Sequence, residues 1–116
     1  MEGVGFAQSA EGTCSVPNRA SIAQALVAHV YGVTLADMRA ATRGQPRAAL
    51  ARQIAMYLSR VVFEMSLGEV AHAFGRDRST ASHAFHHIED LRDDPELDRT
   101  LGYLETLLRG TAGPRS

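Results

Sequence analysis

The polar residues best suited to chemistry gather in one short stretch, from residue 76 to residue 83. This stretch combines two arginines with short hydrogen-bonding side chains and a histidine: Arg76, Asp77, Arg78, Ser79, Thr80 and His83. Planar guanidinium groups and short hydroxyls can contact base edges and phosphates in a DNA major groove, which is about 12 Å wide. The pattern therefore predicts nucleic-acid binding, although Asp77, Ser79 and Thr80 would also serve simply to cap a helix.

A metal or enzyme site is a competing interpretation of the same region. His83 and His87 stand four residues apart, with His86 beside them, so a helix would bring them to one face. Alanine and phenylalanine follow His83, so the glutamate general base of the metalloprotease pattern is missing. Cys14 is the single cysteine and stands in a polar segment that would not orient a base. We expect no metal, no cofactor and no enzyme activity.

The charge of the chain is unevenly distributed. The 116 residues carry a net charge of -1, but residues 38–85 have a local balance of +4, between -2 for residues 1–37 and -3 for residues 86–116. A basic centre between acidic flanks predicts a localised anion-binding face. The chain has no lysine and no glycine-rich phosphate loop, so we expect no nucleotide site. No apolar run approaches the ~20 residues of a bilayer span and no signal peptide is recognisable, which predicts a cytoplasmic location.

The scaffold predicted for residues 76–83 is a helix-turn-helix. Ser66-Leu-Gly-Glu69 forms a capping box ahead of a two-turn helix with apolar residues at i, i+3, i+4 and i+7. Gly75 would end this helix as a C-cap, and a longer helix would start at residue 77 or 78 and run to about residue 91. We expect Phe74 and Phe85 in the core, because both lie on the apolar stripes of these helices.

Four more helices complete the predicted fold, an all-α bundle of about six helices. They cover about residues 19–30, 34–39, 46–63 and 95–109. In the first helix, Asn18 is the expected N-cap and Ile22 and Val30 belong to the buried stripe. In the third, Ser59 shares a polar face with Arg52, Gln53 and Arg60. The domain would span residues 18–109, between a disordered leader (1–17) and a disordered tail (110–116).

Several blocks of the sequence carry a resemblance to one known family. They are Arg52-Gln-Ile-Ala-Met-Tyr-Leu58, Ser66-Leu-Gly-Glu-Val70 and Phe74-Gly-Arg-Asp-Arg-Ser-Thr80, followed by His83-Ala84 and Ile88-Glu89. Over about residues 20–92 the chain resembles the C-terminal DNA-binding domain (domain IV) of the bacterial chromosomal replication initiator DnaA. The resemblance implies a helical fold with a helix-turn-helix, and double-stranded DNA as the partner.

The resemblance also implies a role for each residue that matches the family motif. The segment from Arg76 to Thr80 would begin the recognition helix and read bases in the major groove. Arg43 and Arg47, in the basic loop ahead of the long helix, would reach the adjacent minor groove. Arg52 would contact the DNA backbone, and His83 would lie near the phosphates.

The sequence departs from the family pattern at the reading residues themselves. A single glycine precedes Arg76 where the family has two, Arg78 replaces a histidine, and Ser79 replaces a threonine. The nucleotide-binding module of the initiator has no counterpart in the chain. We therefore expect a stand-alone, sequence-preferring DNA-binding protein of the bacterial nucleoid, which regulates replication initiation or transcription and prefers a site different from the initiator box.

A protein-interaction module is the alternative function. A relative of this domain could bind the replication initiator or its regulators without needing DNA, and the acidic residues of 86–116 favour such a partner surface. The arginine pattern of residues 76–78 favours DNA. The salt dependence of binding to random duplex distinguishes the two functions, because DNA binding through several phosphates weakens steeply as the salt concentration rises.

Overall fold

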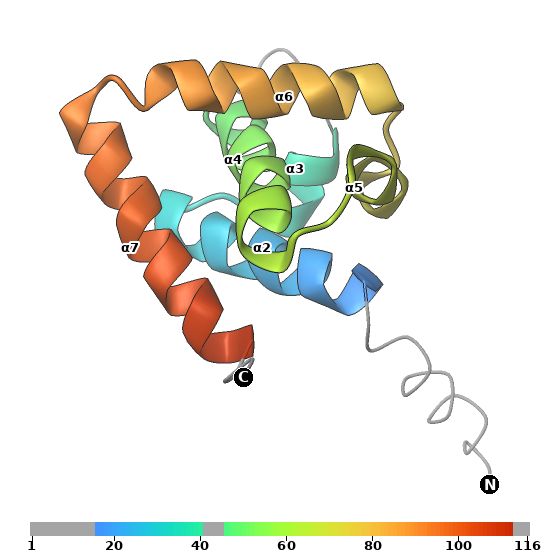
Figure 1. Ribbon diagram of the computed structural model, residues 1–116, viewed down its shortest axis with the longest axis horizontal. Helices are drawn as coiled ribbons and strands as arrows, with labels where there is room; N and C mark the ends of the chain where they lie inside the picture. Colours follow the sequence, from blue (N-terminus) through green and yellow to red (C-terminus); the bar gives the residue numbers. More distant parts are fainter. Residues whose placement is uncertain (1–15, 41–45, 113–116) are drawn as a thin grey trace, which may run out of the picture.

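The protein is an all-α bundle in the computed structural model, which describes residues 16–40 and 46–112 (Figure 1). These residues form six helices: α2 (Val16–Tyr31), α3 (Leu35–Ala40), α4 (Pro46–Phe63), α5 (Leu67–Phe74), α6 (Arg78–Leu91) and α7 (Pro95–Ala112). The predicted fold class and the helix-turn-helix of α5 and α6 are confirmed. No helix within the described ranges is long and apolar enough to cross a membrane.

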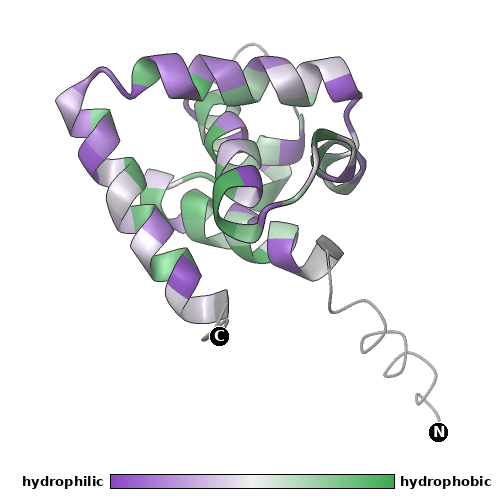
Figure 2. Ribbon diagram, in the orientation of Figure 1, coloured by the Kyte–Doolittle hydropathy of each residue, from purple (hydrophilic) through white to green (hydrophobic). Residues whose placement is uncertain are grey.

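Helix α4 is the centre of the bundle. It packs against α2, α3, α5, α6 and α7, which surround it in Figure 1. Residues 54–59 are all buried, so for more than one turn α4 has no solvent face. A helix that is buried all round belongs to the core of a fold. Figure 2 shows the matching pattern, with hydrophobic residues where α2 and α4 cross and hydrophilic ones along the outside of α6.

Ser59 corrects one detail of the prediction. The sequence pattern predicts it on a polar face of the helix, but its side chain is fully buried. Its hydroxyl donates a hydrogen bond to the carbonyl oxygen of Ala55, one turn earlier, over 2.9 Å. A serine that is satisfied by its own helix can be buried at little cost. The prediction is wrong because the residue type alone does not show where its hydroxyl bonds.

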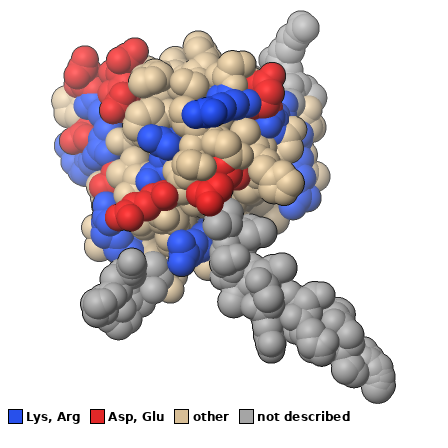
Figure 3. All heavy atoms as spheres, turned by 45° about the vertical axis from the view of Figure 1, so that its right-hand side comes forward, with Lys and Arg blue, Asp and Glu red and all other residues tan. Residues whose placement is uncertain are grey.

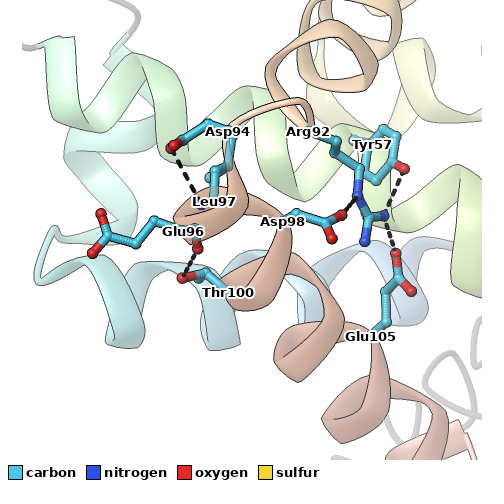
Figure 4. Close-up of polar contacts among 8 residues, drawn as sticks. All are labelled: Tyr57, Arg92, Asp94, Glu96, Leu97, Asp98, Thr100 and Glu105. Atoms are coloured by element: carbon cyan, nitrogen blue, oxygen red, sulfur yellow. Dashed lines mark hydrogen bonds and ion pairs between the residues drawn. The ribbon is translucent and has the colours of Figure 1, made fainter.

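The ends of the outer helices also differ from the prediction. Helix α2 begins at Val16, so Asn18 lies within the helix and is not its N-cap, while residues 1–15 are outside the described part. Helix α7 continues to Ala112, into the segment expected to be a tail. Helix α7 begins at Pro95, as predicted. The Asp94 carboxylate just before it accepts a hydrogen bond from the backbone N–H of Leu97 over 3.3 Å (Figure 4).

The buried face of α2 is built from small residues. Ile22 and Val30 are exposed by 36% and 40%, although the sequence pattern places them in the core. Ala23 and Val27, which the same pattern places on that stripe, are buried as predicted, together with Ala20. Because close-packed interiors leave few voids, small side chains on α2 allow its backbone to approach α4 closely. The helix is therefore turned so that its alanines, not its largest apolar residues, face the core.

A charged cluster attaches α7 to the rest of the bundle (Figure 4). Arg92, which follows α6, donates hydrogen bonds to Asp98 (2.6 Å) and Glu105 (2.7 Å) of α7 and to the hydroxyl of Tyr57 on α4 (2.9 Å). Partial burial on its own lowers the pKa of Arg92, but the hydrogen bonds that it donates to Tyr57, Asp98 and Glu105 outweigh this effect and raise that pKa above its ordinary value. The cluster fixes the corner between α6 and α7.

Replacing Arg92 by alanine should destabilise the fold. Arg92→Ala removes three hydrogen bonds to charged or polar partners, so the free energy of unfolding should fall by about 1–3 kcal/mol, measured by urea denaturation. Arg109→Ala changes an exposed arginine on α7 and should alter that free energy by less than ~0.5 kcal/mol. Equal stability of the two variants would show that the cluster contributes nothing net.

Phe85 packs against the hydrophobic core but remains partly exposed. Its ring stacks on Tyr57 with centroids 5.4 Å apart, and the guanidinium of Arg60 lies 5.0 Å from its centroid. Phe74 is likewise only partly buried against the core. The prediction that both face the core is confirmed, while their complete burial is not.

Truncation of Phe85 should therefore cost less than truncation of a fully buried phenylalanine. We expect Phe85→Ala to lower the free energy of unfolding by about 2–3 kcal/mol, below the ~3–5 kcal/mol typical of full burial. Chemical denaturation followed by circular dichroism measures it. A loss under ~1 kcal/mol would mean that the ring is a surface group whose stacking on Tyr57 adds no stability.

Candidate nucleic-acid interface

The first helix of the helix-turn-helix starts at the predicted capping box. The backbone N–H of Glu69 donates to the Ser66 hydroxyl over 3.1 Å, and the N–H of Ser66 donates to the Glu69 carboxylate over 2.8 Å. These reciprocal bonds satisfy two N–H groups that a helix start leaves without partners. They fix the start of α5 and, with it, the position of Leu67.

A single glycine makes the turn between α5 and α6. Gly75 has φ 66° and ψ 34°, a left-handed conformation that glycine adopts without strain. The N–H of Gly75 donates to the carbonyl oxygen of His72, and the N–H of Arg76 donates to that of Ala71 over 2.9 Å. This pair of bonds is the helix ending expected for a C-cap glycine. The turn is therefore complete with one glycine.

Asp77 caps the recognition-helix candidate α6. Its carboxylate accepts the backbone N–H of Thr80 (2.9 Å) and the hydroxyl of Ser79 (3.2 Å). The bond from the Thr80 backbone, followed by bonds from the side chains of Thr80 and Ser79, lowers the pKa of Asp77 below its ordinary value. The predicted N-cap is confirmed. Both bonds are accepted by Oδ1 of this exposed carboxylate, so its other oxygen makes no hydrogen bond with a described residue.

The outer face of α6 presents the rest of the predicted stretch to solvent. Arg78, Ser79, Thr80 and His83 are all exposed. The opposite face consists of the small or branched residues Ala81, Ala84 and Ile88, which pack into the core. The helix thus presents polar groups outward and is held close to its neighbours by small side chains.

A groove of about 650 Å³ lies over the first turns of α6 and the start of α5. It is lined by residues of both helices: Leu67, Arg78, Ser79, Ser82, His83 and His86. Leu67, Ser82 and His86 are not among the predicted site residues. Helical spacing from Ser79 does reach Ser82, His83 and His86, but Leu67 joins them only through the packing of α5 on α6.

Two of the predicted arginines lie together at the C-terminal end of α3. Arg52 of α4 donates to the carbonyl oxygen of Met38 over 2.8 Å, and Arg76 donates to that of Arg39 over 3.1 Å. The last carbonyls of a helix carry a partial negative charge that attracts cations. Burial, and next the positive charge of Arg76, lower the pKa of Arg52. A cavity of about 350 Å³ lies at this place, and Arg52, Arg39 and His72 are among the residues that line it.

The predicted basic loop is described only in part. Arg43 lies in residues 41–45, outside the described part of the chain. Arg47 is exposed at the start of α4 and donates to the carbonyl oxygen of Tyr31, at the end of α2, over 3.4 Å. Thus Arg78, Ser79 and His83 meet at one groove, Arg52 and Arg76 meet at the end of α3, and Arg47 points to the end of α2.

The charges on this side of the molecule do not form one continuous basic surface. In Figure 3, arginine side chains are interspersed with carboxylates. Across residues 16–40 and 46–112, no group of three or more histidine, cysteine, aspartate or glutamate side chains is arranged to hold a metal ion. The rings of His83 and His87 are parallel, with centroids 6.2 Å apart on the outer side of α6.

Comparison with known proteins gives one family. The family model for the bacterial dnaA protein helix-turn-helix matches residues 21–88. The chromosomal replication initiator protein DnaA of Bordetella pertussis is 42% identical over 89 residues, which is 75% of this chain and 19% of that protein. The chain therefore spans about a fifth of the length of such relatives.

Solved structures agree with the family in fold. A crystal structure of a DNA replication initiation factor superposes with a TM-score of 0.74 and 32% identity, over 83% of this chain and 30% of that one. The AMPPCP-bound DnaA from Aquifex aeolicus gives a TM-score of 0.77 and 29% identity, over 92% of this chain and 32% of that one. With a capped α5, a one-glycine turn and an exposed α6, the chain belongs to the family of the bacterial DnaA helix-turn-helix domain.

Proposed function

We propose that this protein binds double-stranded DNA with a preference for sequence, placing the start of α6 in the major groove. The observation that carries the proposal is the exposed row Arg78, Ser79, Thr80 and His83 on the second helix of a helix-turn-helix. In that motif the second helix enters the groove with its N-terminal residues on the base edges. Membership of the DnaA family supports the same partner.

Arg78 is the base-reading residue in this proposal. It is exposed, stands in the first turn of α6 and makes no ion pair with any described residue. A free guanidinium in that position can donate two hydrogen bonds to the O6 and N7 atoms of guanine. A preferred site with a G·C pair opposite Arg78 would differ from the site of relatives that carry histidine there.

Arg52 and Arg76 have a different task, which is to hold phosphate. Both guanidinium groups are anchored to the last carbonyls of α3, and each keeps further N–H donors beyond the one that bonds a carbonyl. Two neighbouring cations repel each other, and a phosphate between them would relieve that repulsion. Arg76 therefore contributes affinity and not sequence preference, unlike the role that the family motif implies.

The biological role we propose is control of replication initiation in the bacterial nucleoid. The relatives matched are named as replication initiators, and the matched part is about a fifth of their length. The protein-interaction alternative is weakened in part, because Asp98 and Glu105 are bonded to Arg92 and Asp94 caps α7. These three acidic groups have partners within the fold, while the side chains of Asp90, Asp93 and Glu96 are exposed.

The proposed function is tested directly by selection of duplexes from a random library. We expect recovery of a defined site that contains a G·C pair and binds more tightly than random duplex. Immunoprecipitation of the tagged protein from cells then separates the two roles, since sites at a replication origin support initiation control and sites only at promoters support transcription. Recovery of no duplex, together with capture of the initiator, would favour the interaction module.

Arg78→Ala should relax the sequence preference at one base pair. We expect a loss of about 1–3 kcal/mol on the selected site and a much smaller loss on random duplex, because one bidentate base contact is removed. Fluorescence anisotropy with both duplexes measures the difference. Equal losses on the two duplexes would make Arg78 a phosphate contact.

Arg52→Gln and Arg76→Gln should weaken binding to all duplexes alike. Each variant removes one phosphate contact, so the slope of log affinity against log salt should flatten by about 0.9 for each arginine. Arg19→Gln, at an exposed position on α2, is the matched control and should leave the slope unchanged. An unchanged slope in the Arg52 and Arg76 variants, with the fold intact by circular dichroism, would remove the end of α3 from the interface.

A further inference from the structure

After Arg78, the basic side chains of α6 are all histidines. They are His83, His86 and His87, and all three are exposed. The rings of His83 and His87 lie parallel, with centroids 6.2 Å apart, and His86 stands edge-on to Phe85 at 5.4 Å. Histidine is the side chain whose charge changes between pH 5 and 8. The outer face of α6 therefore carries three side chains of the type whose charge depends on pH.

The position of these histidines along α6 suits contact with DNA phosphates. An α-helix rises 1.5 Å per residue, so residues 78 and 87 are about 14 Å apart, close to the ~12 Å width of the major groove. With the first turn of α6 among the bases, its third turn lies at the rim of the groove, where the phosphates are. His83 and His86 also line the same surface groove as Arg78.

We propose that His86 and His87, together with His83, bind DNA phosphates in their protonated form, so that binding takes up protons and is tuned by pH. The inference rests on the proposed function, because it needs α6 to enter the groove. A neutral histidine offers a phosphate one N–H donor, whereas a protonated histidine offers two donors and a full charge.

Charged groups of both signs lie around the histidines. The carboxylate of Glu89 is 3.4 Å from Nδ1 of His86, and Asp90 is the next residue along the chain. Other ionisable groups lie on α6 itself and on the two helices packed against it, α4 and α5: Arg78 on α6, Arg60, Tyr57 and Arg52 on α4, and Glu69 and His72 on α5. Arg78 and Arg60 contribute positive charge, and the Glu69 carboxylate is bonded to the backbone of Ser66.

The sign of the pH dependence follows from linkage. A phosphate stabilises the charged imidazolium, so the histidines hold their protons more tightly in the complex than in the free protein. By reciprocity, protons strengthen DNA binding. Affinity should rise as pH falls through the range in which histidine titrates, and this gain should be lost as pH rises above it.

The experiment measures the affinity of the full chain for a random duplex of about 20 base pairs, over a range of salt, at about pH 6 and about pH 8. For the unmodified protein we expect binding about ten-fold or more tighter at the lower pH, with a salt slope steeper by about 1–2 units, because protonated histidines add phosphate contacts. His86→Gln with His87→Gln should remove most of both differences.

Two matched variants make the result specific. His86→Lys with His87→Lys places permanent charges at the same positions and should keep the steep slope at both pH values. His29→Gln changes an exposed histidine on α2, which lies across α4 from α6 in Figure 1, and should retain the full pH dependence. Circular dichroism at each pH confirms that the variants are folded.

Two kinds of outcome would overturn the inference. They differ in whether the proposed DNA-binding function fails as well. If the unmodified protein binds duplex equally well at both pH values, protonated histidines do not hold phosphate, although the proposed function stands. If the double glutamine variant keeps the full pH dependence, His86 and His87 do not hold phosphate, and the inference fails for them in the same way. If the protein binds no duplex at either pH, even at low salt, the proposed function fails as well.

Discussion

The burial of α4 on all sides is the constraint on which the rest of this structure depends. Every other described helix packs against it, and residues 54–59 have no solvent face. The orientation of each helix is therefore set by its contact with one shared element. Arg52 and Tyr57 stand on α4 as well, so the same helix supports the arginine pair at the end of α3 and the cluster around Arg92. The candidate interface and the corner between α6 and α7 therefore both depend on side chains of α4.

The helix-turn-helix divides its polar residues between holding the fold and facing solvent. The carboxylate of Asp77 accepts hydrogen bonds from the backbone N–H of Thr80 and the hydroxyl of Ser79, and Gly75 ends α5. Arg76 leaves the turn toward α3 and not toward α6. Of the two arginines in the sequence motif, one anchors the turn to a neighbouring helix, and the other, Arg78, is exposed and makes no ion pair with a described residue. A residue's place in a motif does not by itself set its task.

Local features of this fold could be predicted from the sequence because they depend on backbone bonding between near neighbours. The capping box at Ser66 and Glu69, the C-cap at Gly75 and the N-cap at Asp77 each involve residues no more than five apart. Helical periodicity likewise indicated six helices and the inward faces of α5, α6 and α7. The same local signals indicated the helix-turn-helix, and the polar residue types of 76–83 indicated Arg78, Ser79 and His83, to which the family resemblance added roles.

Long-range placement was decided only by the tertiary structure, because it depends on groups far apart in the chain. Arg76 reaches a carbonyl 37 residues away, and Arg92 bonds the hydroxyl of Tyr57 35 residues away. Neither contact leaves a periodic signal in the sequence. The burial of Ser59 and the exposure of Ile22 follow from how closely α2 and α4 approach, which is set by packing and not by hydrophobicity alone. The sequence determined which helices form and how they are capped, while packing on α4 decided which side chains remained available for a ligand.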